Sequence, residues 1–347
     1  MAREGTVNEN KSKPPMSPGA LLRWALLCAV LTSCADRVSG RLDEIRASAL
    51  PPVQSPADNL STPEKVALGR QLFVDRRLSG SGTMACQSCH YRHLGWTDGL
   101  ALSRKDDGSL NTRHTPTLYN VGYQSAWYWD GRATTLEGQV LAAWRGQMSG
   151  DPVQVAAALN ALPGYAAQFQ QVFSAPASGE TIAKALAAYL RTKNSDSSPW
   201  DRYEIGQKTA VGADAVAGQA LFVGKARCAS CHAPPYYGNG GYYNIGLEAG
   251  KARPDAGRYD VTRNEADIGA FKTPTLRSIA LSAPYFHDGS VAGLRKAVSY
   301  MANGGGADPL KSELLRPTGL SETEIDQLVA FLRALTSDEV WTEPTLP

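Results

Sequence analysis

The sequence predicts a mostly α-helical protein that contains two related domains. Apolar residues recur at helical spacing in several segments, whereas the alternation typical of strands is scarce. A partial internal repeat links the two halves of the chain, because residues 69–73 and 218–222 carry Gly, Leu and Phe at the same spacing. Each of these segments leads into a cysteine-containing motif. Two domains built on one plan are therefore expected.

The helices can be placed from their start signals and their apolar spacing. The first is expected to begin after Ser61, with Pro63 in its first turn and Glu64 three residues past the cap. A helix over 213–223 precedes the second cysteine motif in the same way. Further helices are expected at 153–162, 181–192, 291–301 and 322–335, and loops at 236–246 and 303–306.

The N-terminus is predicted to be an export signal. Arg23 precedes a short apolar run that ends in the tetrapeptide LTSC at 31–34, which resembles a bacterial lipobox. On this interpretation Cys34 is lipidated and becomes the first mature residue, and a simple cleaved signal is the alternative. Asp36 does not directly follow Cys34, so inner-membrane retention is not indicated. We expect a periplasmic protein anchored to the outer membrane.

The domain boundaries follow from these features and from shifts in composition. We expect a signal peptide at 1–33, a Pro-, Ser- and Ala-rich tether at 34–58, an N-terminal domain at 59–205, a C-terminal domain at 206–338 and a tail at 339–347.

Composition argues against two broad classes of protein. Apolar residues make up 43% of the chain and charged residues 20%, and no apolar run approaches the roughly 18 residues needed to span a bilayer. A multi-pass membrane protein is therefore excluded. With the first 33 residues set aside, acidic and basic side chains balance, which gives no support to nucleic-acid binding.

Two motifs carry the chemistry, CQSCH at 86–90 and CASCH at 228–232. In each, two thiols can add to the vinyl groups of a haem, and the adjacent histidine is then held against the iron as an axial ligand. A zinc site would lack a fourth ligand, and a redox CxxC pair expects a βαβ setting. We expect two covalently attached c-type haems, bound by Cys86, Cys89, Cys228 and Cys231 and ligated by His90 and His232.

Three longer segments resemble one known family. They are RHTPTLYN at 113–120, WYWDGRATTLEGQ at 127–139 and FKTPTLRSIALSAPYFHDGS at 271–290. From about residue 60 to 337 the chain resembles the bacterial di-haem cytochrome c peroxidases, a family that also includes a di-haem enzyme that matures methylamine dehydrogenase. The resemblance implies two cytochrome c-like domains with unequal haems, one reactive and one that transfers electrons.

The resemblance implies a sixth ligand for the C-terminal haem. In the family this ligand lies fourteen residues past the histidine of the APYFH segment, which from His287 leads to Met301. A methionine resembles the peroxidases, whereas the maturation enzymes use a tyrosine, and Tyr300 is the alternative ligand here. Peroxidases of this family often hold a second histidine against the other haem, in a loop that corresponds to 99–112. This loop contains no histidine here, so we expect an open iron without a protein sixth ligand at the His90 haem.

The resemblance also implies residues around the reactive haem. The family places a glutamate before a methionine as the acid–base group, and this chain has Gln147 before Met148. A neutral amide cannot transfer the proton itself. It could orient peroxide, with Gln139 and Arg145 as helpers.

Two further positions concern the space between the haems. Trp129 matches a tryptophan between the haems of relatives and is expected to carry electrons, while Arg132 is expected to pair with a propionate. A packing role at the domain interface is the simpler interpretation of both. Calcium between the domains is doubtful, because His114 stands where relatives have an asparagine and the remaining ligands would be backbone oxygens near Ser282 and Pro284.

Together these features predict a periplasmic peroxidase that reduces hydrogen peroxide to water. A small cytochrome c or a cupredoxin is the expected electron donor, and a homodimer is an option because relatives are often dimers. Two alternatives stay open at this stage. One is a di-haem electron carrier without catalytic activity, and the other is a maturation-type oxidase that acts on a partner protein.

Overall fold

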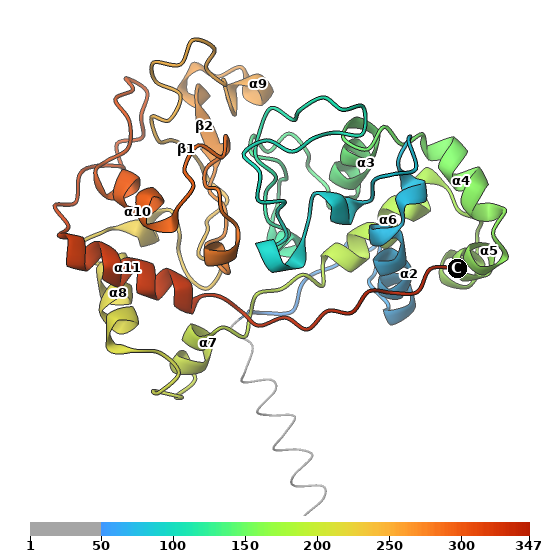
Figure 1. Ribbon diagram of the computed structural model, residues 1–347, viewed down its shortest axis with the longest axis horizontal. Helices are drawn as coiled ribbons and strands as arrows, with labels where there is room; N and C mark the ends of the chain where they lie inside the picture. The colour runs from blue at the N-terminus through green and yellow to red at the C-terminus, as the bar shows by residue number, and fades with distance from the viewer. Residues whose placement is uncertain (1–49) are drawn as a thin grey trace, which may run out of the picture. The chain divides into compact units, whose positions relative to one another are not determined.

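A computed structural model describes residues 50–347 of the chain (Figure 1). The predicted signal peptide, the lipidated Cys34 and most of the predicted tether lie outside the described residues. Across the described part, none of the helices combines the length and the apolar character that a membrane crossing requires.

Five helices form the N-terminal half. The first of them, α2, begins one residue later than the sequence predicts, and its cap is Thr62 rather than Ser61. The Thr62 hydroxyl accepts a hydrogen bond from the backbone N–H of Lys65, and Pro63 occupies the first turn. α2 packs against α6, and the two helices enclose a core that includes Leu72, Phe73 and Trp144. The helices are α2 (Pro63–Val74), α3 (Leu136–Gly146), α4 (Pro152–Asn160), α5 (Pro163–Phe173) and α6 (Gly179–Leu190).

The C-terminal half repeats this plan on a smaller scale. α8 packs against α11 as α2 packs against α6. Phe222 and Phe331 meet in the core of the C-terminal half. A short antiparallel sheet pairs Tyr242 with Lys272 and Tyr243 with Phe271. The elements are α7 (Pro199–Glu204), α8 (Ala213–Val223), β1 (Tyr242–Asn244), α9 (Tyr259–Thr262), β2 (Ala270–Lys272), α10 (Leu294–Ala302) and α11 (Glu322–Ala334).

The repeated glycine explains how each helix pair approaches so closely. A β-carbon at Gly69 would overlap the carbonyl oxygen of Ala185 in α6, and one at Gly218 would overlap that of Gln327 in α11. Each glycine therefore lets a backbone lie directly against its partner helix. The mostly α-helical, two-domain fold with an internal repeat is confirmed.

Element boundaries differ from the expectation in several places. α10 begins at Leu294 rather than 291, because the carbonyl of Val291 accepts the backbone N–H of Tyr285 and Gly293 is the extended cap. α4 and α6 are shifted by one or two residues, and β1 lies inside a segment expected to be a loop. The sequence interpretation also missed four helices, α3, α5, α7 and α9.

The two hydrophobic cores divide between Leu190 and Trp200. α7 was assigned from sequence to the N-terminal domain, yet the Trp200 ring meets that of Phe331 edge-on, with centroids 4.9 Å apart. Arg277 holds α7 in place through a fully buried ion pair with Asp201 at 2.9 Å. α7 therefore packs as part of the C-terminal half.

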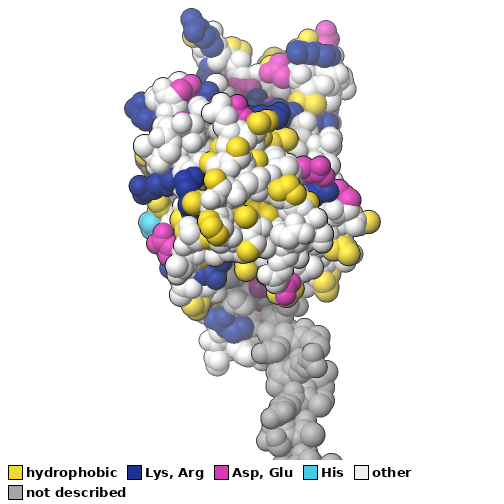
Figure 2. Space-filling model, turned by 90° about the vertical axis from the view of Figure 1, so that its right-hand side faces the viewer, with side chains coloured by type: hydrophobic (Ala, Val, Ile, Leu, Met, Phe, Trp, Pro, Cys, Tyr) yellow, Lys and Arg dark blue, Asp and Glu magenta, His cyan; other side chains and the backbone are white. Residues whose placement is uncertain are grey.

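Both ends of the described chain lie against the N-terminal half. The hydroxyl of Tyr123 donates to the carbonyl of Pro51 at 2.7 Å, which attaches the described part of the predicted tether to the N-terminal half. After α11 the tail runs back past α2 (Figure 1), and Pro347 ends beside Gly164 of α5. On the face that carries α4 and α5, hydrophobic side chains lie among uncharged ones (Figure 2), and Val153 of α4 is 79% exposed.

The close helix contact yields a stability prediction. Gly69→Ala should lower the free energy of unfolding by about 1–3 kcal/mol, because the added methyl group must push α2 away from α6. Gly146→Ala is the matched control, since a β-carbon there meets open space, and it should stabilise the helix slightly. Chemical denaturation of the haem-loaded protein measures both. Equal stability of the two variants would contradict the steric role of Gly69.

Candidate functional site

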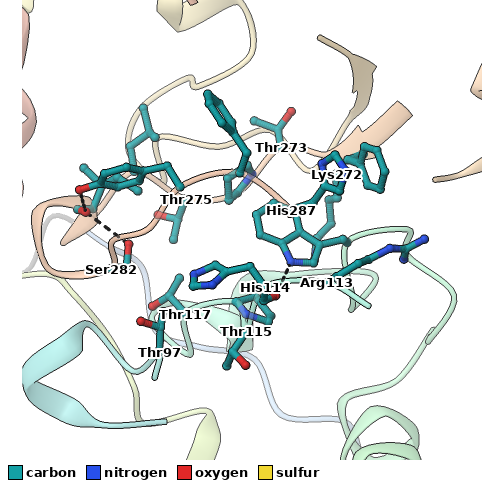
Figure 3. A pocket seen from close by; sticks show the side chains of 18 of the residues that line it. Thr97, Arg113, His114, Thr115, Thr117, Lys272, Thr273, Thr275, Ser282 and His287 are labelled. Atoms are coloured by element: carbon teal, nitrogen blue, oxygen red, sulfur yellow. Dashed lines mark hydrogen bonds between the residues drawn. The ribbon is translucent and has the colours of Figure 1, made fainter. Parts of the chain in front are cut away.

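A cavity of about 660 Å³ runs between the two halves and reaches both cysteine motifs. Figure 3 shows residues of the N-terminal half on one side of it and residues of the C-terminal half on the other. Every cysteine and histidine of the two motifs contributes to its lining, namely Cys86, Cys89, His90, Cys228, Cys231 and His232. The fold therefore opens both motifs onto one shared space.

The first motif lies on a 3-10 turn, Cys86–Ser88, that follows α2. The Nδ1 atom of His90 forms a 2.7 Å hydrogen bond with the carbonyl oxygen of Trp96. This bond occupies Nδ1 and leaves Nε2 free, and burial lowers the pKa of His90, which favours the neutral ring that coordination would require. His90 would therefore be suited to hold a haem iron.

The second motif repeats this arrangement on the 3-10 turn Cys228–Ser230, which follows α8. Here Nδ1 of His232 bonds to the carbonyl oxygen of Tyr237 at 3.0 Å. Burial raises the pKa of Cys86 and of Cys228 to about 12, so neither thiol is activated as a redox nucleophile. These cysteines, their histidines and the shared cavity fit two covalently attached haems.

Met301 and Tyr300 are clearly separated by their contacts. Met301, on α10, lines the cavity. The hydroxyl of Tyr300 instead donates to the carbonyl of Ile245 at 3.0 Å, and its ring packs on Phe286. Met301 is thus the residue of the pair that reaches the haem space.

Gln147 lines the cavity and carries a buried polar atom without a hydrogen-bond partner. It caps α3, and its carbonyl accepts the backbone N–H of Asp106 at 2.9 Å. Its side-chain Oε1 is buried without a hydrogen-bond partner. The neighbouring Met148 sulfur lies 3.9 Å from that of Cys86, which places this segment at the first motif. A buried acceptor left open in this way is suited to a ligand that donates a hydrogen bond.

The other candidate residues divide between the cavity and the surface. Gln139 lines the cavity, whereas Arg145, in the last turn of α3, is exposed and lies outside it. Arg132 also lines the cavity, where it pairs with Asp130 at 2.8 Å and lies over the Tyr128 ring at 3.6 Å. The structure therefore brings Gln139 and Arg132 together with Gln147 and leaves Arg145 apart.

Trp129 is held by both halves of the molecule. Its indole Nε1 donates to the carbonyl of His114 at 2.8 Å, and its own carbonyl accepts the backbone N–H of Lys272 at 2.8 Å. Its ring also meets that of His287 edge-on, with centroids 6.4 Å apart. Trp129 is thus fixed at the contact between the two halves.

A charged network that sequence reasoning missed surrounds this tryptophan. Arg113 bonds to Asp130 at 2.6 Å in its own half and to Asp255 at 2.7 Å in the other. His287 bonds to Glu248 at 2.7 Å, and Glu248 also accepts the backbone N–H of Asp255. Burial acts to lower the pKa of Arg113, but its bonds to both aspartates outweigh burial and raise that pKa. In the sequence, His287 served only to identify Met301, which lies fourteen residues after it.

Two of the residues that the resemblance relates to a calcium ion have side-chain hydrogen bonds within the protein. His114 bonds through Nδ1 to the carbonyl of Leu100 at 2.7 Å, and the Ser282 hydroxyl donates to the carbonyl of Ile279. Within residues 50–347, no group of three or more His, Cys, Asp or Glu side chains is arranged to hold a metal ion. We do not propose calcium.

Comparisons with known families divide the chain as its two motifs do. Residues 63–209 match the family model of di-haem cytochrome c peroxidase, and residues 215–336 match that of cytochrome c. Each match contains one CxxCH motif.

Individual relatives are similar over nearly the whole chain. A cytochrome-c peroxidase, IdrP1, from Denitromonas iodatirespirans is 39% identical, over 94% of this chain and 96% of the relative. The methylamine utilization protein MauG of Methylorubrum extorquens is 37% identical, over 94% and 98%. A crystal structure of a MauG-like protein associated with microbial copper homeostasis superposes with a TM-score of 0.77 at 32% identity, covering 84% of this chain and 94% of that one.

The position of Met301 yields a redox prediction. Met301→His should lower the reduction potential of one haem by roughly 0.1–0.3 V, because methionine ligation favours the ferrous iron more than histidine ligation does. Spectroelectrochemical titration measures both haems in one sample. Tyr300→Phe is the control and should leave both potentials in place. A shift that appears with Tyr300→Phe instead would assign the sixth ligand to the tyrosine.

Proposed function

We propose that this chain, which belongs to the di-haem cytochrome c peroxidase family, reduces hydrogen peroxide to water in the periplasm. The observation that carries the proposal is the buried, unpartnered Oε1 of Gln147 beside the first motif, set against Met301 at the other end of the cavity. When bound, a haem on His90 supplies an iron with an exchangeable position, and a haem on His232 and Met301 supplies a reservoir of electrons.

Gln147 is proposed to orient the substrate. Its Oε1 can accept a hydrogen bond from one O–H of peroxide, which holds the molecule in the cavity next to the first motif. An amide has no titratable proton near neutral pH, so Gln147 cannot move a proton between the two peroxide oxygens. The reaction consumes two electrons and two protons per peroxide and releases two waters. We propose that solvent supplies the protons.

Trp129 is proposed to be the path for electrons between the two motifs. Hydrogen bonds from both halves fix its indole and backbone, so its position does not depend on one domain alone. Its packing against His287 adds a second ring toward the C-terminal half. A residue held this rigidly avoids the reorganisation that mobile groups would impose.

Partner and location complete the proposal. A small cytochrome c or a cupredoxin is proposed to deliver electrons to the haem on His232, since relatives named cytochrome-c peroxidase imply a protein donor. A lipid on Cys34 is proposed to hold the protein at the outer membrane, and a homodimer is compatible with the family. Export is required in any case, because covalent attachment of haem needs it.

A maturation-type oxidase is the second candidate function. The 37% identity to a methylamine utilization protein across nearly its full length favours it. Met301 in the position where such enzymes carry tyrosine argues against it. The two candidates differ in substrate size, because a protein substrate reacts outside the cavity whereas peroxide must enter it.

The spectrum of the ferric protein as isolated tests the proposal. A high-spin fraction that changes promptly when peroxide is added is expected for an open His90 haem. Two low-spin haems that stay inert to peroxide after half-reduction would instead identify an electron carrier. Oxidation of a partner protein at the expense of peroxide, without peroxide reduction by a small electron-donor protein, would favour the maturation function.

Substitution of the cavity amide yields a sharper prediction. Gln147→Glu should raise peroxide turnover by up to ~10²-fold, because a carboxylate can take a proton from one oxygen and return it to the other. Stopped-flow absorbance after half-reduction measures the rate. Gln154→Glu, an exposed site on α4, is the control for the added charge and should have no effect. An unchanged rate in both variants would remove Gln147 from the substrate position.

A further inference from the structure

The C-terminal tail contacts the N-terminal half through one carboxylate. Glu339 accepts hydrogen bonds from the indole Nε1 of Trp96 at 2.9 Å and the Tyr119 hydroxyl at 3.2 Å, and it pairs with Lys193 at 3.1 Å. Its backbone carbonyl also accepts from Arg92 at 2.7 Å. One residue of the tail is thus bonded to four residues of the other half.

The tail is anchored on both sides of this contact. Ser337 bonds to Ser195 at 2.9 Å on the N-terminal side of Glu339. Beyond it, the Trp341 indole donates to the Tyr189 hydroxyl at 3.2 Å, and Arg70 donates to Thr342. Glu339 is therefore held over Trp96 by packing and does not depend on its own bonds alone.

Trp96 connects this carboxylate to the first motif. Its carbonyl oxygen is the acceptor for Nδ1 of His90 at 2.7 Å, and its side chain is only 1% exposed. Its backbone has φ +61°, a left-handed conformation that a bulky side chain adopts rarely and only when its surroundings hold it. The ring of Phe73 and the ammonium of Lys193, 4.6 Å from the indole, hold it from the other sides.

We propose that Glu339 is a positioning residue for the first haem site, acting through Trp96 on the carbonyl that fixes His90. The inference rests on the proposed assignment of the His90 haem as the reactive one. A firm hydrogen bond at Nδ1 gives the imidazole more electron density to donate, and this stabilises the ferric iron. The negative charge of Glu339 acts in the same direction. The tail thereby lowers the potential of the His90 haem.

The second motif has a different neighbour at the matching place. The acceptor for His232 is the carbonyl of Tyr237, and the guanidinium of Arg277 lies 5.4 Å from the Tyr237 ring. Each acceptor residue thus lies beside a cation that is paired with a carboxylate, Lys193 with Glu339 at the first motif and Arg277 with Asp201 at the second. At the first motif the carboxylate also accepts a hydrogen bond from the acceptor residue itself, through the indole of Trp96.

Removal of the charge at Glu339 in the full-length di-haem protein tests the proposal. Glu339→Gln should raise the potential of the His90 haem and lower its iron–histidine stretching frequency in resonance Raman spectra, while the His232 haem stays unchanged. Glu339→Asp restores the charge and should recover part of the shift. Glu343→Gln is the matched control, because this carboxylate lies exposed on the same tail. It should shift neither haem.

The outcomes are decisive in each direction. An unchanged potential of the His90 haem in Glu339→Gln, or an equal shift of both haems, would overturn the inference. If this variant fails to fold, Trp96→Phe removes the same hydrogen bond and keeps the ring, and it should raise the same potential by a smaller amount. An unchanged potential in Trp96→Phe would also overturn the inference. Neither the potential nor the stretching frequency requires peroxide, so both can be measured even if the protein does not turn over peroxide.

Discussion

The bonds of Arg113 to Asp130 and Asp255 are the interaction on which the shared cavity depends. One guanidinium pairs with an aspartate from each half, which ties the two halves together through a largely buried cation. The same contact orders the segment that carries His114, whose backbone bonds to both Trp129 and His287. If the halves separated, Asp255 would lose its bonds to Arg113, and Trp129 would lose its hydrogen bond to Lys272. The coupling of the two motifs is thus built on a bridged ion pair.

Two locally equivalent motifs become unequal through their neighbours. Both histidines bond to a backbone carbonyl, and both motifs follow a helix that packs through a glycine. The first motif lies beside the segment that carries Gln147 and Met148, and Met301 lines the cavity that both motifs share. The repeat accounts for the attachment of two haems, and the residues added around it account for the division of roles between them.

The tail shows how one half can influence the other. It continues from α11, which belongs to the C-terminal core, and ends against α5 in the N-terminal half (Figure 1). On its way it places Glu339 next to Trp96, behind the first motif. The C-terminal tail is therefore part of the environment of the first motif, which lies in the opposite domain.

The sequence by itself determined the helical class, the repeat, the covalent haem sites and the family. These features are encoded locally, since each haem is attached within one five-residue motif and each helix pair depends on one glycine. Only the tertiary structure decided that Met301 rather than Tyr300 reaches the cavity, that Arg145 lies outside it, and that Glu339 bonds to Trp96. The reason is physical: these environments arise where segments distant in the sequence pack together, and the direction of a side chain there depends on all of its neighbours.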